Sequence, residues 1–275
     1  MTASVAAELL ALRKRASSWI LLGLWAVLAL VFAYVVPYVT YLNASAQEPL
    51  ADLLPERLVG TLSGGFPFFG GVFALMLGVL AFGSEYGWGT LKTLLTQGPG
   101  RLHVFAAKLL ALAVALLPFV LVAFALGALG SSAIALREGA TVAWPSPWLL
   151  VQGLAAGWLI LAAWAAFGVL LAVLTRGTAL ATGIGILYAL VIEGLLSALA
   201  SQVSLLDRLV ELFLRANAYS LVAGLGVSPE DVADNGPGSF SGPFVDAAQA
   251  LLVLGAYVTA FLLVAAWLLR RRDVV

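Results

Sequence analysis

The sequence predicts an all-α membrane protein with six transmembrane helices, and three observations support this fold class. Hydrophobic residues make up 63% of the 275 residues, whereas charged residues make up only 10%. A soluble domain carries about 25% charged residues, so this chain has too few polar side chains to cover a water-facing surface. The hydrophobic residues also occur in blocks of about 18 or more, which is the length that a helix needs to cross a bilayer.

Six blocks are long enough to cross a hydrocarbon core of about 30 Å. We expect them to form one transmembrane domain that covers residues 1–275. The expected spans are residues 19–38, 63–83, 104–130, 148–174, 179–200 and 247–269.

The distribution of basic residues predicts that both chain ends face the cytoplasm. With this N-in, C-in topology, the cytoplasmic segments hold ten of the 14 Lys and Arg residues and the outer segments hold four. Most of the acidic residues then lie on the outer side. The inverted topology would reverse this bias, so it is disfavoured.

Two segments outside the spans are predicted to be helical. Residues 1–18 place Val5, Leu9, Leu12 and Ala16 on one stripe, which is typical of an amphipathic helix on the inner membrane surface. The last outer loop, residues 201–246, contains a capping-box pattern at 204–207. A stripe of apolar residues follows that pattern, opposite a face that carries Arg215. We expect a short helix that lies at the outer surface or dips into it.

The cytoplasmic link between spans two and three, residues 85–101, is the most informative segment. Leu91, Leu94 and Leu95 have the i, i+3, i+4 spacing of a short amphipathic helix, and Pro99 lies between two glycines that end it. A domain that grips such a helix can move both adjoining spans together. An ordinary interfacial helix would show the same periodicity, so the spacing alone leaves both interpretations open.

The same segment resembles the motif of permease subunits in the type-2 ATP-binding-cassette exporter family. A Lys at the start of the third span (Lys108) and a basic chain end at residues 270–272 are also similar to this family, as are the topology and the two accessory helices. The residues that carry the motif are Glu85, Gly89, Thr90, Lys92, Leu94, Leu95, Pro99 and Arg101. The family often has Ser or Thr after the proline, where this sequence has Gly100.

This resemblance implies a set of partners. Two permease subunits, as a homodimer or a related heterodimer, would pair with two copies of a separate ATP-binding subunit that grips residues 85–101. ATP and Mg are expected on that partner, because the chain has no G-x-x-x-x-G-K-[ST] loop. We therefore expect no enzyme activity and no cofactor in this chain, contacts with membrane lipid, no nucleic-acid partner, and a location in the bacterial cell membrane.

One further residue is a candidate for function. Glu193 lies within the fifth span, where an ionisable group is costly unless it is paired, protonated or faces a cavity. It is either a pathway or gate residue or a hydrogen-bonded structural carboxylate. His103, the single histidine, is expected to be interfacial, and we predict neither a catalytic residue nor a metal ligand.

The function predicted from the sequence is export of a hydrophobic or amphipathic cargo such as a drug, lipid or peptide. Two alternatives belong to other classes. One is an integral-membrane enzyme that acts on lipid, which needs several polar groups at one membrane depth. The other is a secondary transporter driven by an ion gradient, which typically has inverted repeats and broken helices.

Overall fold

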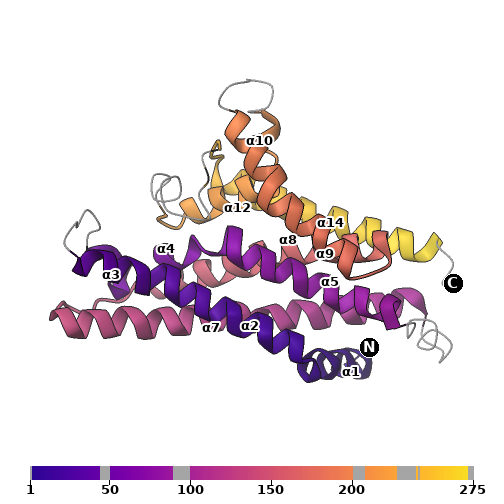
Figure 1. Ribbon diagram of the computed structural model, residues 1–275, viewed down its shortest axis with the longest axis horizontal. Coiled ribbons are helices and arrows are strands. Elements are labelled where there is room, and N and C mark those ends of the chain that lie inside the picture. Colours follow the sequence, from indigo (N-terminus) through magenta and orange to yellow (C-terminus); the bar gives the residue numbers. More distant parts are fainter. Residues whose placement is uncertain are drawn as a thin grey trace.

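The computed structural model describes residues 2–43, 50–88, 100–200, 208–227, 240 and 242–271. Within these residues the regular structure is helical, and most of the long helices run along the long axis of the molecule (Figure 1). Six of the described helices are long and apolar enough to cross a membrane, which confirms the expected number of candidate spans. They are Ala16–Leu42, Phe66–Tyr86, Arg101–Glu138, Pro147–Thr175, Ala179–Ser197 and Ala247–Arg271.

Several of these spans are composed of shorter elements. The first half of the chain contains α1 (Thr2–Lys14), α2 (Ala16–Leu30), η1 (Val31–Val35), α3 (Val36–Leu42), η2 (Leu50–Leu53), η3 (Pro55–Arg57), α4 (Leu58–Ser63), η4 (Phe66–Gly70), α5 (Gly71–Trp88) and α7 (Arg101–Glu138). The second half contains α8 (Pro147–Thr175), α9 (Ala179–Leu187), η5 (Tyr188–Ile192), α10 (Glu193–Ala200), α12 (Leu214–Ala223) and α14 (Ala247–Arg271). The elements η1, η4 and η5 are single π-helical turns, each within a span.

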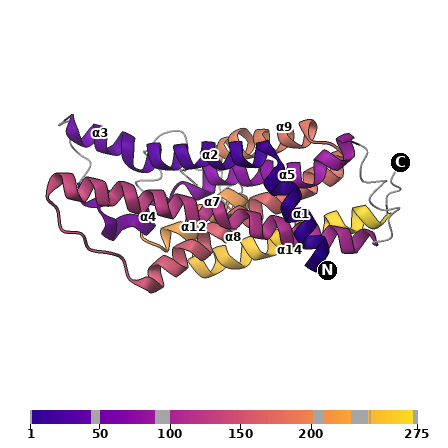
Figure 2. The same cartoon turned by 90° about the horizontal axis from the view of Figure 1, so that it is seen from below.

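Helix α1 and the last turn of α14 lie at the same end of the bundle, which we call the termini end (Figure 1). Helix α1 crosses α7 at an angle to the long helices (Figure 2). Of the expected stripe, Val5 and Leu9 are half-buried and Leu12 is buried, whereas Ala16 is exposed. The apolar face of α1 therefore packs on the bundle, and its position at a membrane surface stays a prediction.

Helix α7 has 38 residues and is about 57 Å long at 1.5 Å per residue. It ends at Gly139, whose φ of 65° is the left-handed conformation that commonly terminates helices. Helix α8 then begins after Ser146, whose hydroxyl accepts a hydrogen bond from the Leu149 N–H at 3.2 Å. The third span thus extends beyond the expected boundary at residue 130.

The core of the bundle is the contact between α5 and α8. A Cβ atom built on Gly78 would overlap the carbonyl oxygen of Ala165, and one built on Gly168 would overlap the carbonyl oxygen of Leu75. The two backbones therefore touch at positions where only glycine fits. Small residues permit this kind of close helix–helix approach in membranes.

Two tryptophans join neighbouring helices to the middle of α7. The Trp25 indole N–H donates to the Phe119 carbonyl at 2.8 Å, and the Trp158 indole N–H donates to the Ala113 carbonyl at 3.0 Å. These bonds give each indole N–H an acceptor in an apolar environment, where an unpaired donor is costly. They lie on either side of Pro118, through which α7 remains continuous.

The last loop departs from its expected structure. Residues 208–210 are helical, residues 211–213 form a turn, and α12 begins at Leu214, so the expected helix is interrupted before residue 216. Arg215 was expected on a polar face but is only 4% exposed. The reason is that α12 packs against α14, α8 and η4, which enclose its polar side chains as well as its apolar ones.

Candidate coupling site at the termini end

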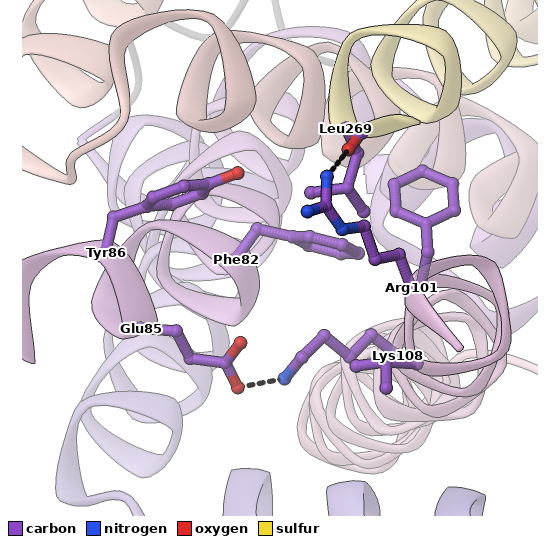
Figure 3. A pocket seen from close by; sticks show the side chains of 8 residues that line it. Phe82, Glu85, Tyr86, Arg101, Lys108 and Leu269 are labelled. Carbon is purple, nitrogen blue, oxygen red and sulfur yellow. Dashed lines mark hydrogen bonds and ion pairs between the residues drawn. The ribbon is translucent and has the colours of Figure 1, made fainter. Parts of the chain in front are cut away.

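A buried ionic cluster joins three helices at the termini end. The Lys108 ammonium group on α7 donates to the Glu85 carboxylate on α5 and, at 2.8 Å, to the Glu8 carboxylate on α1. Figure 3 shows the Glu85–Lys108 pair at the edge of a small pocket. The Lys108 side chain is only 3% exposed. A buried cation is costly without a partner, so this contact holds α1, α5 and α7 in one arrangement.

Arg15 ties the start of the first span to the same region. Its guanidinium donates to the Leu80 carbonyl on α5 at 2.8 Å and approaches the Ser84 hydroxyl at 3.5 Å. Arg15 is also the extended residue that separates α1 from α2. Its side chain therefore fixes the bend between these helices against α5.

Arg101 connects the other side of residues 85–101 to the last span. Its guanidinium donates to the Leu269 carbonyl on α14 at 3.4 Å (Figure 3). Carbonyl groups in the last turn of a helix lack intrahelical partners, so Arg101 supplies a donor to the end of α14. The first turn of α7 is thereby linked to the last turn of α14.

The pocket lies between α5, α7 and α14. Its wall includes the rings of Phe82 and Phe105, whose centroids are 5.3 Å apart. The polar groups that join α5, α7 and α14 lie around these two aromatic rings. The lining residues are Phe82, Glu85, Tyr86, Arg101, Val104, Phe105, Lys108 and Leu269.

The expected coupling residues divide into two groups. Glu85 and Arg101 lie on either side of residues 89–99, and the structure brings both to this pocket. The rest of the motif lies outside the described residues, so its placement stays a prediction. That group comprises Gly89, Thr90, Lys92, Leu94, Leu95 and Pro99.

Two residues of this region, Glu8 and Arg15, were not predicted to have a role at this site. Glu8 lies on the same helical face as Val5, Leu9 and Leu12, so it is an acid within an otherwise apolar stripe. That position was the available signal that Glu8 faces a cation. His103 contacts α1 through a 3.1 Å hydrogen bond between its Nε2 and the Ser4 hydroxyl.

Glu193 lies apart from this cluster and is fully buried. Its carboxylate accepts a hydrogen bond from the Tyr188 hydroxyl at 2.9 Å and faces the Arg215 backbone N–H at 3.3 and 3.4 Å. The structure therefore shows a hydrogen-bonded carboxylate. A role for Glu193 in a transport pathway stays a prediction.

The long apolar helices and their polar contacts at one end define a multi-pass helical membrane protein. The family model described as "ABC-2 family transporter protein" matches residues 4–192, which is more than half of the chain. The chain therefore belongs to the ABC-2 transporter family as its membrane component. Members of this family typically lack an ATPase domain, and membership implies an ATPase partner. A search of the curated proteins finds no match.

Proposed function

We propose that this chain is the membrane-spanning subunit of an ATP-driven exporter and couples to its ATP-binding subunit through residues 85–101. The observation that carries the proposal is the set of polar contacts on both sides of that segment. On one side, Glu85 belongs to the ionic cluster with Lys108 and Glu8. On the other side, Arg101 is bonded to the end of α14.

These contacts provide a physical route for coupling. Residues 89–99 connect the end of α5 to the start of α7, so a force on this segment acts on both helices directly. Glu8 extends the connection to α1, and Arg101 extends it to α14. Because helices are stiff, a displacement at the termini end is carried along their length.

The proposal includes the arrangement of the complex. The termini end faces the cytoplasm of a bacterial cell, in agreement with the basic residues gathered there. Two permease subunits and two ATP-binding subunits form the transporter, and the cargo is hydrophobic or amphipathic. ATP and Mg bind to the partner subunit.

The test is reconstitution of the permease with its ATP-binding subunit. The partner is identified as a soluble ATPase chain that co-purifies with the detergent-solubilised permease. Leu94→Asp is expected to abolish cargo-stimulated ATP hydrolysis, because a charge replaces an apolar side chain at the proposed contact. Val142→Asp is the matched control, since Val142 is exposed in the loop at the other end of the bundle, and it should hydrolyse ATP normally.

Two results would overturn the proposal. One is a purified permease that transports without any ATPase chain. The other is a Leu94→Asp complex whose ATP hydrolysis and transport equal those of the unmodified complex.

A further inference from the structure

Helix α12 is too short to cross a membrane, although it lies among helices that can. It has ten residues and is therefore about 15 Å long, half of the roughly 30 Å of hydrocarbon. Its neighbours α8, α14 and η4 all belong to candidate spans. A helix end in such a position needs hydrogen-bond partners from the protein, because lipid offers none.

The N-terminus of α12 lacks a cap from its own segment. The N-cap residue is Phe213, whose side chain accepts no hydrogen bond. The Glu193 carboxylate from the fifth span lies at this position instead, with both oxygens within 3.4 Å of the Arg215 backbone nitrogen. A carboxylate at a helix N-terminus satisfies free N–H groups and interacts favourably with the helix dipole.

Other side chains hold the turn that precedes α12. The Tyr257 hydroxyl on α14 donates to the Leu212 carbonyl at 2.8 Å. The Asn217 amide donates to the carbonyls of Glu211 and Phe213 at 2.8 and 2.7 Å. The turn is thus fixed from α14 and from α12 itself, and Glu193 is the contribution from the fifth span.

The Arg215 side chain strengthens this arrangement. Its guanidinium lies 5.0 Å from the ring centroid of Phe68, 5.6 Å from that of Tyr219 and 5.8 Å from that of Phe240. Such cation–π contacts are stronger when the cation is removed from water. The side chains of Glu193 and Arg215 are both almost fully buried, at the point where α12 begins.

We propose that Glu193 is a positioning residue whose carboxylate holds α12 in place between the spans. The bond from the Tyr188 hydroxyl orients this carboxylate toward α12. The position of α12 then depends on the fifth span, so a movement of that span carries α12 with it. This inference concerns a part of the chain beyond the coupling segment and does not depend on an ATPase.

The chain contains no cysteine, so a single introduced thiol reports on α12 without background. Ser220→Cys is the reporter because Ser220 lies on α12, is 2% exposed and is close in size to cysteine. Membrane vesicles that contain the full chain are treated with a membrane-impermeant maleimide, and the rate of labelling is measured. We expect slow labelling when Glu193 is present.

Glu193→Leu is expected to raise the labelling rate about tenfold, which is the population shift that corresponds to loss of a helix cap. Glu193→Gln should label at nearly the original rate, because its amide oxygen still accepts hydrogen bonds. Tyr188→Phe, which conserves the ring, should give an intermediate rate.

Glu138→Leu is the matched control, because Glu138 also accepts a tyrosine hydrogen bond, from Tyr38 at 2.6 Å, but does not contact α12. Its labelling rate should stay unchanged. The proposal is overturned if Glu193→Leu and Tyr188→Phe both leave Ser220→Cys protected, or if Glu138→Leu accelerates labelling equally. Labelling needs neither nucleotide nor cargo, so its outcome is separate from that of the coupling test.

Discussion

The charged residues that are almost fully buried in the described part of the chain form two separate clusters. Glu85 and Lys108 lie at the termini end, and Glu193 and Arg215 lie at the start of α12. Buried charges contribute little net stability compared with well-packed apolar residues, but removal of one partner leaves an uncompensated charge. Each cluster therefore favours one arrangement of its helices over others.

Lys108→Met is expected to destabilise the bundle by about 3–5 kcal/mol, because it leaves the carboxylates of Glu85 and Glu8 close together without a cation. The measurement is the apparent melting temperature of the detergent-solubilised chain. The double variant Lys108→Met with Glu85→Leu should recover part of the loss.

The control for this prediction is an exposed ion pair. The Arg57 Nε atom lies 3.8 Å from the Asp52 Oδ1 atom, and the two side chains are 58% and 51% exposed. Arg57→Ala should change stability by less than about 1 kcal/mol. An equal effect of both single variants would contradict a special role for the buried cluster.

Some of these residues are recognisable in the sequence and others are not. Glu85, Lys108 and Glu193 attract attention because each interrupts or borders an apolar block. The partnership of Glu8 with Lys108 joins residues 100 positions apart, and it depends on where α1 crosses α7. Sequence periodicity shows which face a residue lies on but not which helix it faces.

At the scale of elements, the contact between α5 and α8 is the tightest feature of the bundle. Gly78 and Gly168 permit the two backbones to meet, and Gly71 faces the indole of Trp164 in the same interface. Glycines within the spans predict close packing somewhere, but the sequence does not indicate which pair of helices will meet. That choice depends on the three-dimensional arrangement of all the spans.

Gly168→Ala is expected to destabilise the bundle by about 1–3 kcal/mol, because the added methyl group forces the two helices apart. Gly255→Ala on α14 is the matched control, since nothing lies within 4 Å of a Cβ at that position. The measurements are the fraction of the protein that is monodisperse in detergent and its melting temperature. If both variants had the same melting temperature, the contact between α5 and α8 would be looser than described.

Helix α12 shows where prediction of elements fails. The apolar stripe of this loop, which includes Leu209 and Leu212, predicted one short helix that lies at the outer surface or dips into it, yet the turn at residues 211–213 interrupts it. The competing influence is the set of hydrogen bonds from Glu193, Tyr257 and Asn217, which stabilise a new helix start. Bonds between distant segments outweigh a local pattern in this loop.

At the scale of the whole molecule, the number of spans was predictable because hydrocarbon thickness sets the shortest apolar block that can cross, although α7 extends well beyond its predicted end. The lateral arrangement was not, since lipid-facing and protein-facing surfaces of a span are both apolar. The exposed leucines on α9 and α10, such as Leu187 and Leu195, illustrate this ambiguity. Composition does not distinguish a surface that faces lipid from one that faces a second subunit.

The proposed orientation predicts which ends react with reagents outside the cell. In the cysteine-free chain, Val142→Cys should react with a membrane-impermeant maleimide in intact cells, because the loop between α7 and α8 is then external. Lys14→Cys, at the termini end, should react only after the cells have been permeabilised. Both residues are exposed, so accessibility depends on the membrane. The reverse labelling pattern would show that the topology is opposite to the proposed one.

The length of α7 has a practical consequence for imaging. At about 57 Å, this helix exceeds the roughly 30 Å thickness of the hydrocarbon even at a steep tilt. Its final turns run beside α3, where the Tyr38–Glu138 bond braces them. We expect these turns to project beyond the detergent micelle as a rigid post. An antibody fragment raised against this post would provide a landmark for particle alignment of a 28.6 kDa chain in electron cryomicroscopy.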